Sequence, residues 1–319
     1  MNDETGTFKP LDLGRIKTYS IKERKNLSNA NLFAKPALPS DGIHAFFDAL
    51  PDILAAANLR KVIDAIALAY RNKRPVILAL GAHVIKCGLS PLIIDLMQRR
   101  IITALAMNGA TAIHDYEVAL IGATSEDVAA SLKDGSFGMV KETAETFQAA
   151  SARGVKENTG LGRALGERII GEKCDYEDLS LLAWGTKLNI PVTVHVAIGT
   201  DTIHMHPNVS GRDVGESSHI DFRILASVVS HLEGGVWLNV GSAVVLPEVF
   251  LKALCIARNV GNKIENFVTV NMDMIQHYRP QTNVLKRPTS QGYAITGHHE
   301  IMLPLLRMGI LSKIGIGDE

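Results

Sequence analysis

Short apolar runs alternate along this chain with segments of helical periodicity, and this alternation constrains the fold more than any other feature. The run VILAL, which ends just before Gly81, is typical of a strand that is buried on both faces. The stretch Ile53 to Tyr70 instead places Val62, Ile66 and Ala69 at the spacing of an amphipathic helix. Strands that alternate with helices through short connections predict a mainly parallel, doubly wound sheet with helices on both faces, a three-layer Rossmann-like α/β fold.

Six apolar runs are expected to form one sheet: VILAL, IITALAM, IPVTVHVAI, GGVWLNVG, ENFVTVNM and GYAITG. Helices are expected at SPLIIDLMQRR, TSEDVAASL (with Thr124 or Ser125 as N-cap), YEDLSLLAWGTKLN, HIDFRILASVVSHL, LPEVFLKALCIARN and HEIMLPLLRMG. Residues 1–40 lack sustained periodicity, so we expect an extension that lies on the body of the protein or on a neighbouring subunit. A single α/β domain over residues 41–319 should follow it.

Charge and cysteine usage exclude several classes of protein. Lys+Arg and Asp+Glu both number 33, so the basic excess typical of nucleic-acid-binding proteins is absent. The one basic run, Arg15 to Lys25, is interpreted as a solvated segment. Cys87, Cys174 and Cys255 form no CxxC pair, which argues against a disulfide framework. An acidic, polar N-terminus and the lack of a long apolar run predict a cytoplasmic protein that does not enter a membrane.

In open sheets of this kind, ligands bind beyond the carboxyl ends of the strands, so the residues after each strand are the candidates for a site. The loop GAHVIKCG, Gly81 to Gly88, follows the first strand and could present backbone N–H groups to an anion, or be only a structural turn. The similar-looking GLGRALG, Gly160 to Gly166, follows no predicted strand and is interpreted as a flexible loop.

After the second strand, NGATAIHDYE brings His114, Asp115 and Glu117 close together in sequence. A loop could converge these side chains for acid–base work, whereas a helix would spread them over different faces. A helix cap with surface charges is the alternative. The later segment DGSFGM, Asp134 to Met139, could be a loop that closes over a site or a plain turn.

The densest cluster follows the third strand, where GTDTIHMHPN carries Asp201, His204 and His206. An extended segment could aim both histidines at one metal, with a third ligand from another strand-end loop. The possible third ligands are His114, Asp115, His298, His299 and Glu300. Because no stringent metal spacing exists, we favour hydrogen bonding or proton transfer by these histidines and predict no metal.

Small residues follow the fourth strand, where a ligand could approach the backbone at Gly241 and Ser242. The segment HYRPQTNVLKRP follows the fifth strand and carries Lys286, which could hold an anionic group or act as an amine nucleophile. A solvated basic loop is the alternative there. Gly297-His298-His299-Glu300 begins the last helix.

The order of these pieces resembles the deoxyhypusine synthase family over most of the chain from about residue 73. LALGAHVIKCG stands at the family's NAD-binding loop, NGATAIHD at its acidic loop, AIGTD and VGSAVV at two further strand ends, and GHHEIMLPLL at its last helix. The resemblance implies the family's fold, an NAD cofactor and a homo-oligomer such as a tetramer. It also implies eight cofactor-binding residues: Gly81, His83, Asn108, Gly109, Asp201, Gly241, Ser242 and His298. The loops at Gly81, Gly109 and Gly241 should then border one cleft that admits NAD.

Departures from the family are equally informative. The tryptophan–glycine–lysine motif, whose lysine forms the covalent imine in that family, is absent, and Lys286 lies only near its position. His114 stands at a family glutamate, Asp115 at a family aspartate and His298 at another family aspartate. The polyamine-gripping acids are missing too. Deoxyhypusine synthesis is therefore not expected, although the fold and the cofactor cleft are.

The favoured hypothesis is a deoxyhypusine synthase-like transferase or oxidoreductase that acts on a small polar substrate. NAD is its expected cofactor. Its catalytic candidates are His114, Asp115, His204, His206 and Lys286. One alternative is a metal-dependent hydrolase or lyase that uses His204, His206 and an acid. The other is a non-catalytic ligand-binding protein that has lost the family's chemistry.

Overall fold

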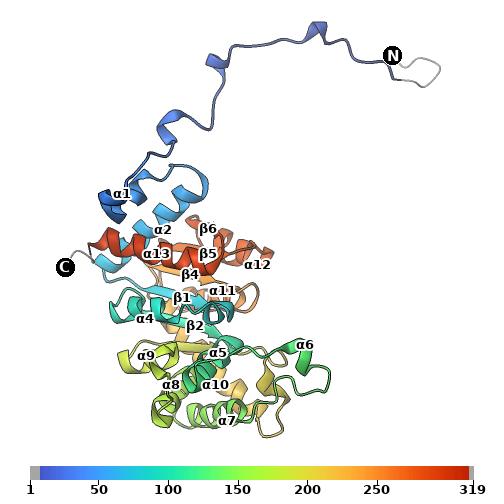
Figure 1. The fold of residues 1–319 in the computed structure, drawn as a ribbon, viewed down its shortest axis with the longest axis vertical. Helices are drawn as coiled ribbons and strands as arrows, with labels where there is room; N and C mark the ends of the chain where they lie inside the picture. Colours follow the sequence, from blue (N-terminus) through green and yellow to red (C-terminus); the bar gives the residue numbers. More distant parts are fainter. Residues whose placement is uncertain (1–7, 316–319) are drawn as a thin grey trace.

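The computed structural model describes residues 8–315 of the chain, and its centre is a six-stranded sheet. The strands are β1 (Val76–Leu80), β2 (Ala104–Asn108), β3 (Val192–His195), β4 (Val236–Val240), β5 (Val268–Asp273) and β6 (Gly292–Thr296). Every neighbouring pair is parallel, in the order β3-β2-β1-β4-β5-β6 (Figure 1). The predicted parallel α/β sheet is confirmed, with all six apolar runs in it.

The strand order reverses beside β1, and this reversal positions the site. The chain builds outward from β1 to β2 and β3, and then returns to the other side of β1 to form β4. Leu80 pairs in register with Val240, so the turns that begin at Gly81 and Gly241 leave the sheet side by side. In doubly wound sheets this switch in strand order is where ligands bind.

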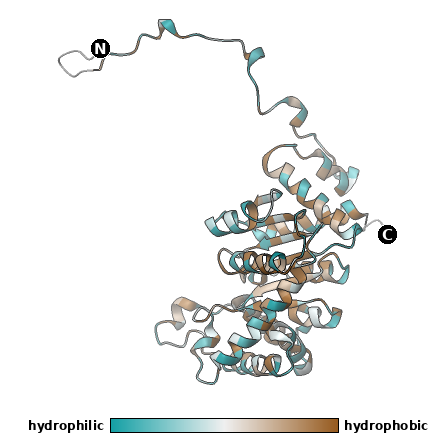
Figure 2. Ribbon diagram, turned by 180° about the vertical axis from the view of Figure 1, so that it is seen from behind, coloured by the Kyte–Doolittle hydropathy of each residue, from teal (hydrophilic) through white to brown (hydrophobic). Residues whose placement is uncertain are grey.

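Helices cover both faces of the sheet. They are α1 (Gly42–Ala49), α2 (Leu54–Arg71), α3 (His83–Lys86), α4 (Ser90–Gln98), α5 (Gly109–Ile121), α6 (Val128–Ser131), α7 (Lys141–Lys156), α8 (Gly160–Glu172), α9 (Leu181–Leu188), α10 (Gly211–Val229), α11 (Val245–Asn259), α12 (Tyr278–Pro280) and α13 (His299–Ile314). Leu78 and Leu105 face the core shared with α2, α4 and α13. Ile77 and Trp237 face the core shared with α10 and α11. Hydrophobic residues run along the central strands (Figure 2), as buried strands require.

The interpretation of GLGRALG as a flexible loop is wrong, because this segment begins α8. Its glycines allow the helix to lie directly against neighbouring backbone. A Cβ on Gly162 would stand 1.9 Å from the carbonyl oxygen of Val192 in β3, and one on Gly166 would stand 2.3 Å from that of Leu182. The spacing therefore reflects close packing at the edge of the sheet, not a nucleotide loop.

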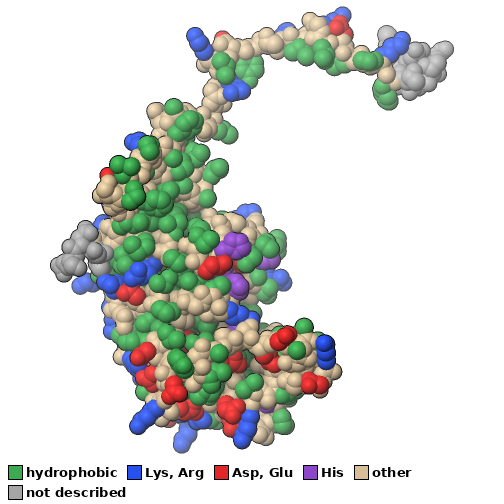
Figure 3. Space-filling view, in the orientation of Figure 1, with side chains coloured by type: hydrophobic (Ala, Val, Ile, Leu, Met, Phe, Trp, Pro, Cys, Tyr) green, Lys and Arg blue, Asp and Glu red, His purple; other side chains and the backbone are tan. Residues whose placement is uncertain are grey.

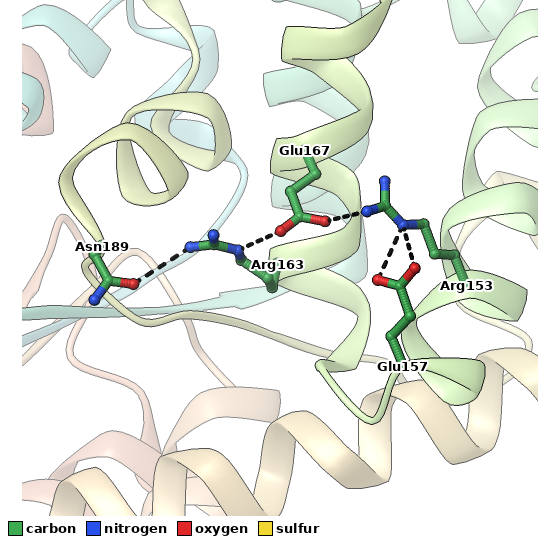
Figure 4. Close-up of polar contacts among 5 residues, drawn as sticks. All are labelled: Arg153, Glu157, Arg163, Glu167 and Asn189. Carbon is green, nitrogen blue, oxygen red and sulfur yellow. Dashed lines mark hydrogen bonds and ion pairs between the residues drawn. The ribbon is translucent and has the colours of Figure 1, made fainter.

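Ion pairs fasten the outer side of α8. Glu167 accepts from Arg163 at 2.7 Å and pairs with Arg153 of α7 at 2.8 Å (Figure 4). Arg153 also bonds Glu157, and Arg163 reaches Asn189 at the end of α9. These contacts tie α7, α8 and α9 into one layer at the β3 edge.

The N-terminal extension leaves the body of the protein (Figure 1). Two backbone hydrogen bonds join the extension to the body. The carbonyl oxygen of Leu32 accepts from the Asp52 N–H, and the Lys35 N–H donates to the carbonyl oxygen of Ala49. Before these links, apolar side chains are exposed, Phe8 to 93% and Leu27 to 90%. The extension thus does not lie on its own domain there. Contact with a neighbouring subunit, like the expected homo-oligomer, stays a prediction.

Within residues 8–315, no helix has both the length and the apolar character needed to cross a bilayer.

Candidate active site

The switch point is formed by two turns that have no side chain between them. A Cβ added to Gly81 would lie 1.9 Å from the carbonyl oxygen of Gly241, so the two backbones touch. Gly241 has a φ of 69°, and a Cβ there would also lie 2.9 Å from Nε2 of His299. Glycine is required at both positions, because the two turns pack directly on each other and on His299.

Histidines and a carboxylate from α3 and α13 border this switch point. The rings of His83 and His299 are 5.9 Å apart between centroids. Sγ of Cys87 lies 3.8 Å from Oε2 of Glu300, although these residues are 213 positions apart in the chain. Figure 3 shows histidine side chains beside acidic ones at the level of α13, and an indented surface between them and the lobe that carries α6.

His299 is the buried member of this group. Its side chain is only 1% exposed, and its Nδ1 has no hydrogen-bond partner among the residues described. Burial lowers the pKa of the His299 imidazole, with smaller opposing effects of nearby carboxylates that include Asp273. Sequence analysis considered His299 only as a possible third metal ligand, because the burial of its ring depends on packing against a distant turn.

Asp201 lies in the loop after β3, and its side chain packs against the start of α5, on the β2–β3 side of the switch point. Its carboxylate lies against Gly109, where an added Cβ would stand 2.0 Å from Oδ2, and it accepts the N–H of Ala110. Oδ2 has no hydrogen-bond partner among the described residues, and the residue is 8% exposed. Burial raises the pKa of Asp201 to about 6. A carboxyl group with that pKa can give or take a proton near neutral pH.

His204 is fixed in its neutral form with a defined tautomer. Its Nδ1 accepts the backbone N–H of Gly199 at 3.1 Å and that of Asp201 at 3.2 Å. The ring hydrogen must therefore sit on Nε2, which is buried and unpartnered within residues 8–315. Burial also lowers the pKa of this imidazole. His204 is thus a hydrogen-bond donor at Nε2 that also shapes the loop carrying Asp201.

His206 holds a loop. Its Nε2 lies 2.9 Å from the carbonyl oxygen of Gly138 in the segment Asp134–Met139. The N–H of Gly138 donates to Glu126 at 2.8 Å, and the glycine packs on Thr202 in the short helix η6 (Thr202–Met205). The segment Asp134–Met139, for which a covering loop and a plain turn were both considered, therefore lies on the segment that carries His204.

The two histidines do not form the alternative metal site. Among the described residues, one group of three possible metal ligands comes together: His83, Cys87 and Glu300. Neither His204 nor His206 belongs to this group. His206 is hydrogen-bonded to the carbonyl oxygen of Gly138, and Nδ1 of His204 accepts hydrogen bonds from backbone N–H groups. A metal-dependent hydrolase built on this pair finds no support in the geometry.

A helix separates Asp115 from His114 and Glu117, whose side chains lie 3.6 Å apart on one face of α5. Asp115 is fully buried and caps α9, accepting from Ser180 Oγ at 2.6 Å and from the N–H groups of Leu181 and Leu182 at 2.8 and 3.1 Å. Burial raises its pKa to about 6, but its hydrogen bonds are filled by the protein. A catalytic role for Asp115 finds no support.

His114 lies on another face of α5, with Nδ1 2.5 Å from the hydroxyl of Thr124. That hydroxyl donates to Glu117. Because Thr124 is used in this way, the predicted N-cap at Thr124 or Ser125 is wrong, and Asp127 caps the short α6 instead by accepting from the Ala130 N–H at 3.1 Å.

Lys286 lies away from the carboxyl edge. It ends the π-helix η7 (Gln281–Lys286) and is exposed. The preceding residue, Leu285, packs its backbone on Gly292, at the amino end of β6. The structure thus brings no lysine of this segment to the switch point.

The remaining predicted cofactor residues divide into two kinds. Asn108 and Ser242 cap helices: Oδ1 of Asn108 accepts the N–H of Thr111 at 2.8 Å, and Oγ of Ser242 accepts that of Leu246 at 3.2 Å. His83 and His298 are exposed at the edge, where His298 Nδ1 lies 3.9 Å from Glu300. The second pair is free to meet a ligand.

A separate cavity of about 270 Å³ lies at the end of β3, between α10 and α11. His195, at the last position of β3, forms one wall, with Ser218, His219 and Phe222 of α10 opposite. His195 is 4% exposed, and burial lowers its pKa to about 3, so this ring is neutral. Its strand context gave no signal of a site from sequence.

Solved structures with a similar fold include the following three proteins. An LOR/SDH protein from Methanococcus maripaludis S2 aligns with 81% of this chain and 70% of its own, at a TM-score of 0.52 and 16% identity. ArgZ, an arginine dihydrolase from the ornithine–ammonia cycle in cyanobacteria, aligns with 79% of this chain and 31% of its own, at 0.50 and 15%. AgrE, solved in ternary complex with ornithine and NAD+, aligns with 81% and 34%, at 0.51 and 14%.

The predicted fold is confirmed, because the chain is structurally similar, at low identity, to these proteins. A protein from Entamoeba histolytica named as a deoxyhypusine synthase also aligns, at a TM-score of 0.45 and 12% identity. The chain spans about a third of the length of ArgZ and AgrE. No family model and no curated protein matches it by sequence.

Proposed function

We propose that this chain is a cytoplasmic enzyme that binds NAD at the β1–β4 switch point and transforms a small polar substrate with Asp201 as the acid–base group. The observation that carries the proposal is the Asp201 carboxyl, whose Oδ2 is unpartnered among the described residues and whose pKa is about 6. A buried carboxyl group that the protein leaves unsatisfied at a strand end is suited to a ligand's hydroxyl or ammonium group.

NAD is supported by two observations. AgrE, which shares the fold, has been solved with ornithine and NAD+. In this chain, the turns at Gly81 and Gly241 meet at the switch point, the place where doubly wound sheets bind ligands. These turns, with His298 at their border, are the residues that would hold the cofactor. The start of α5 is not expected to take its phosphates, because the Asp201 carboxylate already lies there.

The acid–base role moves from the predicted histidines to Asp201. His206 is bonded to Gly138, His114 to Thr124, and His204 carries its hydrogen on Nε2. Ionised Asp201 would take a proton from the substrate, and the neutral His204 Nε2–H would donate a hydrogen bond to a substrate oxygen. Bound NAD would supply hydride acceptance.

Replacing Asp201 by Asn tests this division of roles. Asp201→Asn keeps the size of the side chain but cannot take the proton, so turnover of small hydroxy and amino compounds, followed by NAD+ reduction, should fall about 10²- to 10⁴-fold. NAD+ affinity, measured by calorimetry, should change by less than about threefold. Asp175→Asn, in an exposed turn away from the site, is the matched control and should leave both unchanged. Wild-type protein that gives no heat with NAD+ or NADH at millimolar concentration would refute the proposal.

A further inference from the structure

We propose that His83, Cys87 and Glu300 bind a divalent ion of the zinc type, which links α3 to the start of α13. The site would be separate from the Asp201 carboxyl and does not depend on NAD binding. One nitrogen, one sulfur and one oxygen ligand atom of these three residues all lie within 4.8 Å of one another.

Helix geometry sets two of the ligands in place. His83 begins α3, and Cys87 is its C-cap, four residues later. Side chains four residues apart lie on the same side of a helical turn, so the imidazole and the thiol face the same direction. Glu300 comes from the first turn of α13, which the fold brings over them.

One ligand-to-ligand distance is close to that around a tetrahedral ion. Zinc bonds of ~2.3 Å to sulfur and ~2.0 Å to oxygen, at a tetrahedral angle, separate the two ligand atoms by about 3.5 Å. The Cys87 Sγ and the Glu300 Oε2 are 3.8 Å apart. Both His83 and Glu300 are exposed, so their side chains have room to close on an ion without moving the backbone.

A second observation comes from His299. Its buried Nδ1 lacks a partner among the residues described, and its ring lies 5.9 Å from that of His83. A buried ring nitrogen without a partner costs free energy unless a solvent or ligand group satisfies it. Three protein ligands leave a zinc ion one open position, and a water bound there would provide that group.

The ligand types select the metal. A thiolate, an imidazole and a carboxylate suit zinc and related transition ions, whereas magnesium and calcium prefer oxygen atoms alone. On binding, the Cys87 thiol releases its proton to solvent and the thiolate becomes the sulfur ligand. Within the described residues, the side chain that pairs with Glu300 is His298, at 3.9 Å. A bound cation would therefore compensate the negative charge of the Glu300 carboxylate more closely.

Titration of the untagged, metal-free, full-length chain with Co²⁺ and Zn²⁺ tests the proposal without NAD or substrate. We expect one ion per chain, with a thiolate-to-cobalt charge-transfer band. Loss of a group that merely supports a ligand costs about 10- to 100-fold in affinity, so loss of a direct ligand in Cys87→Ser or Glu300→Gln should cost at least about 100-fold. Cys255→Ser, which removes an exposed thiol on α11, is the matched control and should leave affinity unchanged.

A measurement on the wild-type chain alone covers variants that fold poorly. Zinc should protect Cys87, but not Cys255, from alkylation, as read by peptide mass mapping. Absence of stoichiometric binding, a cobalt complex without the thiolate band, or equal alkylation of Cys87 with and without zinc would overturn the metal site. Because each readout is taken without NAD, a chain that binds zinc but not NAD would refute only the proposed function, and the reverse result only the metal site.

Discussion

Buried ionisable side chains in this protein differ in whether other protein groups satisfy their hydrogen-bonding capacity. Asp115 has three donors from the start of α9, whereas Oδ2 of Asp201 has none among the described residues. Both were candidates from sequence because both follow a strand. Sequence could not separate them, since Ser180, the partner of Asp115, is 65 residues away. For the same reason the approach of Cys87 to Glu300 could not be predicted.

His195 should make stability depend on pH in a defined direction. The folded-state pKa is about 3, well below the ordinary 6.5, so the folded protein keeps this ring neutral while the unfolded chain protonates it. Its stabilising contribution is complete above pH 6.5 and is lost as the pH falls from 6.5 towards 3. Between pH 7 and 5 the loss should be about 2 kcal/mol.

Urea unfolding of His195→Gln at the two pH values checks this expectation. The variant should lose about 2 kcal/mol less than wild type between pH 7 and 5, whatever the buried carboxyls contribute, because they are common to both proteins. His231→Gln, on the surface, should behave as wild type. An identical pH dependence in His195→Gln would show that this ring titrates normally in the fold.

At the scale of elements, the apolar runs predicted every strand because strands buried on both faces need apolar residues throughout. In the layer at the β3 edge, α9 was predicted, but α8 was missed for a physical reason. On the buried face of α8, glycines interrupt the apolar residues Leu161, Ala164, Leu165 and Ile169, and Gly162 contacts the backbone of Val192. A pattern of glycines without side chains to pack resembles a loop in sequence and a tightly packed helix in structure.

Two glycines of α8 should respond to alanine in opposite ways. A Cβ at Gly162 would stand 1.9 Å from the Val192 carbonyl oxygen, so Gly162→Ala should destabilise the protein by about 1–3 kcal/mol or more. Gly171 lies in the same helix with nothing within 4 Å of an added Cβ, so Gly171→Ala should stabilise by up to about 1 kcal/mol. Urea midpoints compare the two, and equal effects would contradict the packing described for α8.

At the scale of the whole molecule, the strand order determines where chemistry can occur. Because all six strands are parallel, the loops at Gly81, Asp201 and Gly241 reach one edge although more than a hundred residues separate the first from the others. Sequence predicted this edge and several of its residues, Asp201 and His204 among them. The family resemblance predicted that the loops at Gly81 and Gly241 border one cleft. Their direct backbone contact depends on β4 returning to pair with β1, which local sequence patterns do not show.

Hydrogen–deuterium exchange of the full-length chain, with and without saturating NAD+, tests the central claim most directly. The account predicts slower exchange on NAD+ addition in the turns after β1 and β4, residues 81–88 and 241–245, and no change around residues 159–167 at the β3 edge. Unchanged exchange at both turns, or protection confined to another part of the chain, would contradict an NAD site at the switch point.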